Sequence, residues 1–129
     1  MFVTTIPQYV LGMTNAKVDL TTTNATVLYT APSGADFNSS VITSILVHDD
    51  SNNGDTLTVT ITDVSSNVFQ IFEKSIAGHA TEELLTKDLA LKEGEILKVT
   101  AATANRLHVV ASIQELSKTR VTTSALAQI

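Results

Sequence analysis

Cysteine and tryptophan are absent from this sequence of 129 residues, and proline occurs only twice. Without cysteine the chain can form no disulfide, no thiolate zinc site, no iron–sulfur cluster and no cysteine nucleophile. A chain of this length buries roughly two-thirds of the surface that its unfolded form exposes, so it can hold a core without such cross-links. The length also indicates one domain rather than two.

Charged residues are scarce, at 16% of the chain, and the formal net charge is -5. Broad binding of nucleic acid or of an anionic membrane needs a basic surface, which eight scattered Lys and Arg residues do not supply. No apolar run approaches the roughly 20 residues of a membrane helix. Residues 1–16 also lack the basic start of a signal peptide. We therefore expect neither nucleic acid nor membrane as a partner.

The residues that are abundant favour β-strands. The chain contains 20 Thr, 13 Val and 9 Ile, which together make up about a third of it. Strand-like runs separated by turn signals recur every eight to twelve residues, as in antiparallel sandwiches. We predict a soluble, all-β protein with a jelly-roll-like antiparallel β-sandwich at residues 16–116. Residues 1–15 are predicted to form an N-terminal arm, and residues 117–129 a C-terminal arm or a last strand.

Individual strands can be placed by their alternation. Leu57, Val59 and Ile61 should face the core from a strand over residues 56–63, with threonines on its other face. Residues 41–48 are apolar on both faces and should form the strand before it, joined in a hairpin through Asn53-Gly54. Residues 95–101 and 107–116 are predicted to form a second hairpin. Residues 82–91 fit either a short helix or two short strands, and we favour the strands.

Residues that could carry chemistry do not form a recognisable motif. Residues 49–55 resemble the start of a calcium-binding loop, but Thr60 occupies the position of the bidentate Glu, so a structural turn is favoured. His48, His79 and His108 lack the spacing of metal ligands and are interpreted as structural. The five glycines stand apart and build no phosphate-binding loop. We expect no catalytic residue, no metal site, no cofactor and no enzymatic activity.

Large apolar side chains on the irregular end segments are the best candidates for an interface. Such groups either pack on their own domain or cross to a neighbouring molecule. Self-assembly would account for them, although a monomeric sandwich would also fit. The candidate interface residues are Phe2, Ile6, Tyr9, Val121, Leu126 and Ile129.

Residues 24–116 resemble small structural proteins of tailed bacteriophage virions. The resemblance is carried by TVLYTAPSG at 26–34, by VITSILVHDD at 41–50 with TLTVTITD at 56–63, and by LALKEGEILKVTAATANRLHVVASIQEL at 89–116. It implies a virion component, most naturally a cement or decoration protein on the capsid surface. Such a protein would form homotrimers and bind the major capsid protein or another virion protein.

Two alternatives remain open from the sequence. Within the virion, the chain could belong to the tail, the neck or the base of a fibre. A carbohydrate-binding sandwich is the alternative from another class, but sugar platforms usually expose aromatic side chains. This chain has no Trp and only two tyrosines, Tyr9 and Tyr29.

Overall fold

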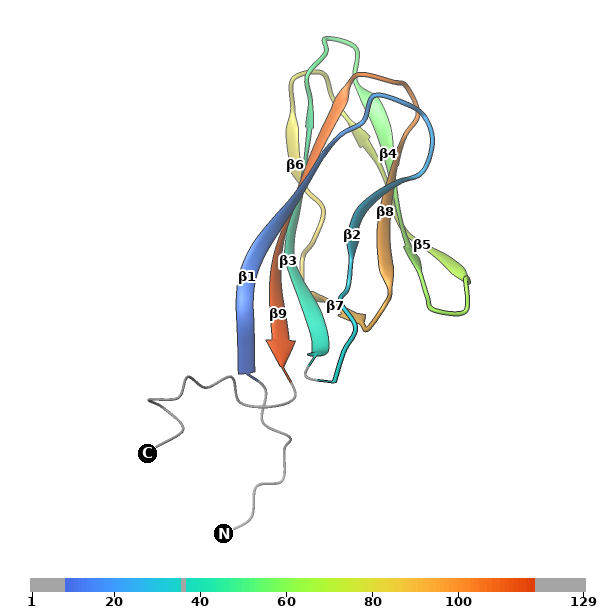
Figure 1. Cartoon of the computed structure of the whole chain (residues 1–129). Coiled ribbons are helices and arrows are strands. Elements are labelled where there is room, and N and C mark those ends of the chain that lie inside the picture. Colours follow the sequence, from blue (N-terminus) through green and yellow to red (C-terminus); the bar gives the residue numbers. More distant parts are fainter. Residues whose placement is uncertain (1–8, 36, 118–129) are drawn as a thin grey trace.

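The computed structural model describes residues 9–35 and 37–117, which form two antiparallel β-sheets packed face to face (Figure 1). No helix that could cross a membrane occurs in these residues. The strands are β1 (Tyr9–Asp19), β2 (Thr26–Thr30), β3 (Phe37–Asp49), β4 (Asp55–Thr62), β5 (Val68–Ile76), β6 (Thr81–Glu83), β7 (Leu89–Lys92), β8 (Ile96–Ala101) and β9 (Leu107–Ser117).

The strand order is that of a jelly roll. The first sheet has the order β1-β9-β3-β6, with β7 also paired to β3, and the second sheet has the order β2-β8-β4-β5. Both β6 and β7 lie along β3, so they act as one interrupted strand and each sheet is four strands wide. Most strands that follow one another in the chain lie in different sheets. Two four-stranded sheets connected in this way match the jelly-roll arrangement. The predicted fold class is therefore confirmed.

The core lies between the sheets and is built from the alternating apolar positions of the long strands. Leu57 and Val59 of β4 are completely buried, as predicted, while Ile61 is half-buried. In β3 the register shifts between Ile42 and Ser44, so that Ile42 and Ile45 both point inward despite their odd spacing. The largest fully buried side chains are Leu20, Ile42, Ile45, Leu57, Ile76, Leu91, Leu97, Leu107, Ile113, Val47, Val59 and Val99.

The two predicted hairpins are wrong. Strand β3 pairs with β9, β6 and β7, whereas β4 pairs with β5 and β8, so the segment between β3 and β4 crosses from one sheet to the other. Strands β8 and β9 also belong to different sheets. In a hairpin within one sheet and in a connection that crosses to the other sheet, the apolar faces of both strands point into the sandwich. The alternation of apolar residues therefore could not distinguish the two arrangements.

The crossing between β3 and β4 depends on a close backbone approach. Gly54 has a φ of 74°, and a Cβ added there would lie 2.8 Å from the carbonyl oxygen of Ile76. Gly78, between β5 and β6, packs closely against the same loop: a Cβ added there would lie 2.6 Å from the carbonyl group of Asn52. Only glycine fits either position without moving backbone.

The ends of the sandwich differ from the predicted boundaries. Strand β1 begins at Tyr9, so residues 9–15 belong to the first sheet and not to an arm. Strand β9 continues to Ser117, one residue past the predicted end of the domain. Residues 82–91 contain parts of two short strands, β6 and β7, in agreement with the extended structure that we favoured.

Candidate interaction surfaces

Both terminal segments join the sandwich at the same place. Tyr9, the first residue of β1, is paired with Ser117, the last residue of β9. Residues 1–8 and 118–129 therefore continue from neighbouring points at one end of the first sheet. Of the candidate interface residues, only Tyr9 falls within a strand, and the other five lie outside the described residues: Phe2, Ile6, Val121, Leu126 and Ile129.

A polar cluster joins the two sheets near this end. The hydroxyl of Tyr29 on β2 lies 2.5 Å from Oε2 of Glu115 on β9 and 2.7 Å from Oγ of Ser40 on β3. Ser40 is completely buried. Gly12 is the partner of Glu115 on β1, so the carboxylate has no side chain beside it on that strand. These contacts fasten the second sheet to the first, beside the strands that carry the chain ends.

The surroundings of Tyr29 hold its hydroxyl in the protonated form. Burial raises the pKa of Tyr29 well above its ordinary value, because the phenolate would lose its hydration. The hydrogen bond to Glu115 raises the pKa further, since the bond needs the phenolic proton. A tyrosine in this state is a hydrogen-bond donor and not a base, which indicates a structural role.

Exposed apolar side chains gather on the edge strand β1. Val10 is 49% exposed, Leu11 43% and Met13 71%. We call these three residues the β1 patch. On the neighbouring strand β9, Val10 is paired with Leu116 and Met13 with Gln114. Gln114 is paired in turn with Val41 on β3, so the positions beside the patch are also uncharged. The first charged residue of β1 is Lys17.

A second apolar group lies at the hairpin between β4 and β5, which projects beyond the body of the sandwich (Figure 1). Val64 in the turn is 74% exposed, and Val68 and Phe69 at the start of β5 are 63% and 55% exposed. We call these three residues the β5 patch. Phe69 lies in β5, and its sequence surroundings give no sign that its side chain is exposed.

Asp63 fixes the turn that presents this patch. Its Oδ1 accepts hydrogen bonds from the backbone N–H groups of Ser65 and Asn67, both at 2.9 Å, and its Oδ2 accepts one from the side chain of Asn67. These hydrogen bonds, chiefly those from Asn67, lower the pKa of Asp63 because they favour the carboxylate.

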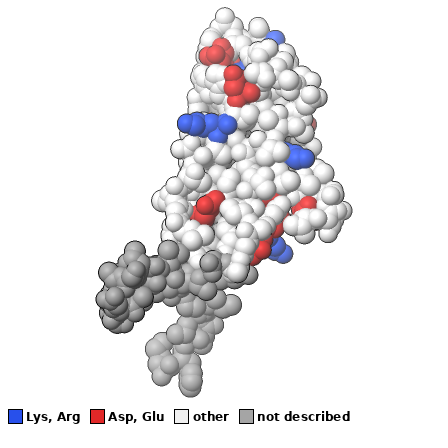
Figure 2. Space-filling view, viewed as in Figure 1, with Lys and Arg blue, Asp and Glu red and all other residues white. Residues whose placement is uncertain are grey.

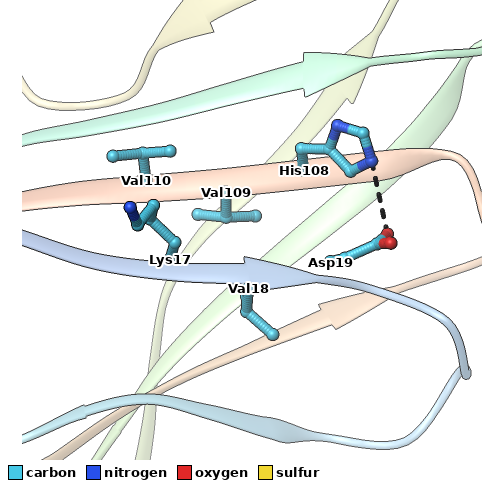
Figure 3. A pocket seen from close by; sticks show the side chains of 6 residues that line it. All are labelled: Lys17, Val18, Asp19, His108, Val109 and Val110. Carbon is cyan, nitrogen blue, oxygen red and sulfur yellow. Dashed lines mark ion pairs between the residues drawn. The ribbon is translucent and has the colours of Figure 1, made fainter.

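A shallow groove of about 310 Å³ runs between β1 and β9 and contains one ion pair (Figure 3). Nε2 of His108 lies 3.3 Å from Oδ1 of Asp19, and both side chains are about half exposed. An exposed pair of this kind contributes little stability. In Figure 3, Lys17 lies away from the pair, so the charged groups do not converge on one point. The groove is lined by Lys17, Val18, Asp19, His108, Val109 and Val110.

The other histidines make single polar contacts. Nδ1 of His48 lies 2.8 Å from Oγ1 of Thr81, across the β3–β6 pair. His79, in the loop before β6, is hydrogen-bonded through Nε2 to the side chain of Asn52. Within residues 9–35 and 37–117, no group of three or more His, Asp or Glu side chains is placed to hold a metal ion.

The loop over residues 50–54 uses its polar groups to shape the crossing between the sheets. Oδ1 of buried Asp49 accepts hydrogen bonds from the N–H and the hydroxyl of Ser51. Asp55 accepts a hydrogen bond from the N–H of Thr103, and Arg106 donates one to the carbonyl of Gly54. These contacts support the interpretation of the loop as a structural turn.

The surface carries few charges, and they are dispersed. Figure 2 shows the side of the molecule seen in Figure 1, where small groups of acidic or basic side chains, some of opposite sign side by side, stand among broad neutral areas. The surface on this side therefore offers apolar and neutral polar contacts rather than a field of one sign.

Comparison with known proteins gives the fold and no family. No protein-family model and no curated protein matches the chain. The chain is similar in structure to a protein of the Bacillus endospore appendages, which form a family of disulfide-linked pili. That superposition has a TM-score of 0.52 and 8% sequence identity and covers 89% of this chain and 96% of the other.

Two further structures superpose more loosely. One holds the CBM22-1 and GH10 modules of Clostridium thermocellum xylanase 10B, with a TM-score of 0.45, 11% identity, and 92% of this chain but 28% of the other covered. The second is Eiger TNF from S. frugiperda, with a TM-score of 0.43, 11% identity, and 88% and 90% covered. At these identities the likeness shows the fold alone, an all-β sandwich.

Proposed function

We propose that this chain is a non-enzymatic structural protein of a bacteriophage virion. More specifically, it acts as a capsid cement or decoration protein, a homotrimer that binds between neighbouring capsid subunits on the surface of the head. The resemblance of residues 24–116 to structural proteins of phage virions supports the assignment of the chain to a virion. The pairing of Tyr9 with Ser117 is the structural observation that supports an adhesive role.

This pairing puts the points at which the two terminal segments leave the sandwich side by side, at one pole of the described residues. Both terminal segments start there, with Phe2 and Ile6 on one and Val121 and Leu126 on the other. The exposed β1 patch lies on the strand that the first of these segments enters. This pole would then contribute to the contacts of assembly, both with the shell and between copies.

The proposed mechanism is multivalent binding. A trimer that contacts several capsid subunits holds each contact at a high effective concentration, so weak individual contacts add up to stable attachment. A protein that binds only the assembled shell stabilises it by a free energy that grows with occupancy. Because few charges are available, attachment should depend mainly on apolar burial and change little with salt.

The test uses virions of the phage whose genome encodes the chain. Peptide mass spectrometry of purified virions should detect the chain in many copies, and labelled antibodies should mark heads rather than tails. Mild denaturant should release it, after which heads should break at a lower temperature until the purified protein is returned. The double variant Phe2→Asp/Ile6→Asp should fail to restore heads, whereas Thr58→Ala, on the sandwich body, should restore them. Virions that lack the chain would refute the proposal.

A further inference from the structure

The exposed large apolar side chains of the described residues are concentrated at two places. Eight such side chains are exposed, and six of them form the β1 patch and the β5 patch, while Val27 and Leu46 stand outside both. Scattered exposed apolar residues need no explanation, but contiguous groups mark interaction sites. We therefore expect each of the two patches to contact a partner.

The two patches lie on opposite edges of the sandwich. Strand β1 ends the first sheet and contacts β2, which ends the second sheet on the same side. Strand β5 ends the second sheet on the far side, where Lys74 forms an ion pair with Glu82 of β6. Two different surfaces on opposite edges of one molecule suit a head-to-tail contact between copies, which can close into a ring.

The start of β5 is an edge that can accept another strand. Within residues 9–35 and 37–117, strand β5 pairs only with β4. Residues 68–72 carry no charge, whereas Glu73 and Lys74 protect the other half of the strand. Proteins usually protect an edge with charge or by keeping it short, and an uncharged apolar edge invites strand addition. Among the other outer strands of the described sheets, β1 is long and carries no charge before Lys17, and it presents the β1 patch, whereas β2, β6 and β7 have at most five residues each.

The segment that suits this edge is residues 2–6, FVTTI. It consists of β-branched and aromatic residues and carries no charged side chain. In an extended strand Phe2, Thr4 and Ile6 would share one face, so two apolar side chains could meet the β5 patch. The C-terminal segment suits it less well, because Lys118 and Arg120 precede its apolar residues.

Residues 2–6 cannot pair along their whole length with β5 of their own chain. Sheets pack about 10 Å apart and neighbouring strands lie about 4.8 Å apart. Because β5 is three strands away from β2, it lies roughly 17 Å or more from β1. Ile6 is three residues from Tyr9 and can extend at most about 11 Å from it. An N-terminal segment whose residues 2–6 all pair with β5, Ile6 included, therefore belongs to a second copy.

We propose that residues 2–6 of one copy add as a strand to residues 68–72 of a second copy, and that the β1 patch of the first copy packs beside the β5 patch of the second. Repeated around a ring, this contact covers both patches in every copy. The inference rests on the self-association included in the proposed function, and it names the two surfaces that meet.

The test is a complementation between two full-length variants. The arm variant, Phe2→Asp/Ile6→Asp, keeps its edge, and the edge variant, Val68→Asp/Phe69→Asp, keeps its arm. Each variant alone should be a folded monomer by light scattering. The dissociation constant for its self-association should be at least about 100-fold higher than that of the native chain. Mixed, they should form pairs of one copy each, since a single working contact is restored.

Two controls keep the test specific. Val27→Asp, at a position 50% exposed but outside both patches, should leave the oligomer intact, as should Val121→Asp/Leu126→Asp. If the edge variant does not fold, Val64→Asp in the turn, at a position 74% exposed, replaces it. Hydrogen exchange should show that those amides of residues 68–72 that point away from β4 are protected in the native assembly and unprotected in the arm variant, as strand addition requires.

The outcomes separate this inference from the proposed function. Variants that remain oligomeric, a mixture that remains monomeric, or a native chain that is monomeric at about 100 μM would each overturn the inference. None of these results alters whether the chain is found in purified virions, which is the test of the proposed function.

Discussion

The hydroxyl of Tyr29 and the carboxylate of Glu115 meet across the two sheets at 2.5 Å, although 86 positions separate them in the chain. Tyr29→Phe removes the donor and leaves a half-buried carboxylate without this partner. We expect the free energy of unfolding to fall by about 1–3 kcal/mol, measured by urea denaturation. Glu115→Gln keeps an acceptor and should cost less. A change below about 0.5 kcal/mol for Tyr29→Phe would show that the contact does not stabilise the sandwich.

The raised pKa of Tyr29 predicts a loss of stability in alkaline solution. Above pH 10 or so, a tyrosine in the unfolded chain loses its proton while folded Tyr29 keeps its own, so ionisation favours unfolding. Below the unfolded pKa this contribution is fully present. The urea midpoint should therefore fall more steeply from pH 9 to 11 in the native protein than in Tyr29→Phe. Parallel curves would contradict the assigned surroundings of the hydroxyl.

The capping of the β4–β5 turn by Asp63 predicts the opposite pH dependence. Its pKa is lowered by hydrogen bonds that need the carboxylate, so the stabilisation is present above the ordinary aspartate pKa and is lost as the pH falls through the lowered value. An NMR titration should find the pKa of Asp63 below the ordinary aspartate value. Asp63→Ala should lower the melting temperature at pH 7 but not at pH 2. Equal effects at both pH values would rule out a role for the charge.

The alternation along β4 predicts a large difference between neighbouring substitutions. Leu57 is completely buried, whereas the side chain of Thr58 lies on the outer face of the same sheet and is only partly buried. Leu57→Ala should reduce the free energy of unfolding by about 2–5 kcal/mol, because it removes buried methyl groups and leaves a cavity. Thr58→Ala should change it by less than about 1 kcal/mol. Similar losses at the two positions would mean that the inward face is misassigned.

Much of the strand content could be predicted because one face of each strand is buried, so apolar residues recur at every second position. The strand predicted over residues 56–63 is observed as β4 (Asp55–Thr62), and its Leu57 and Val59 are buried as expected. The pairing of strands was not predictable in the same way. Asn53-Gly54 indicates a tight change of direction, but a turn of positive φ serves a crossing between sheets as well as a hairpin.

The candidate surfaces were harder to foresee, since they depend on contacts distant in the sequence. Tyr29 and Glu115 carry no local signal of their pairing. The exposure of Phe69 arises because its hairpin projects past the opposite sheet, where β6 and β7 are short and interrupted. The apolar residues near the N-terminus follow no clear strand or helix period, which is why residues 9–15 were predicted as part of an arm although they form the start of β1.

The central claim is that the chain is a building block of a virion, and electron cryomicroscopy of the virions tests it most directly. The account predicts jelly-roll densities in a regular array on the head, three around each local axis, with residues 2–6 of one copy beside β5 of the next. Heads that carry no such density, in virions from which the chain is also missing by mass spectrometry, would contradict it.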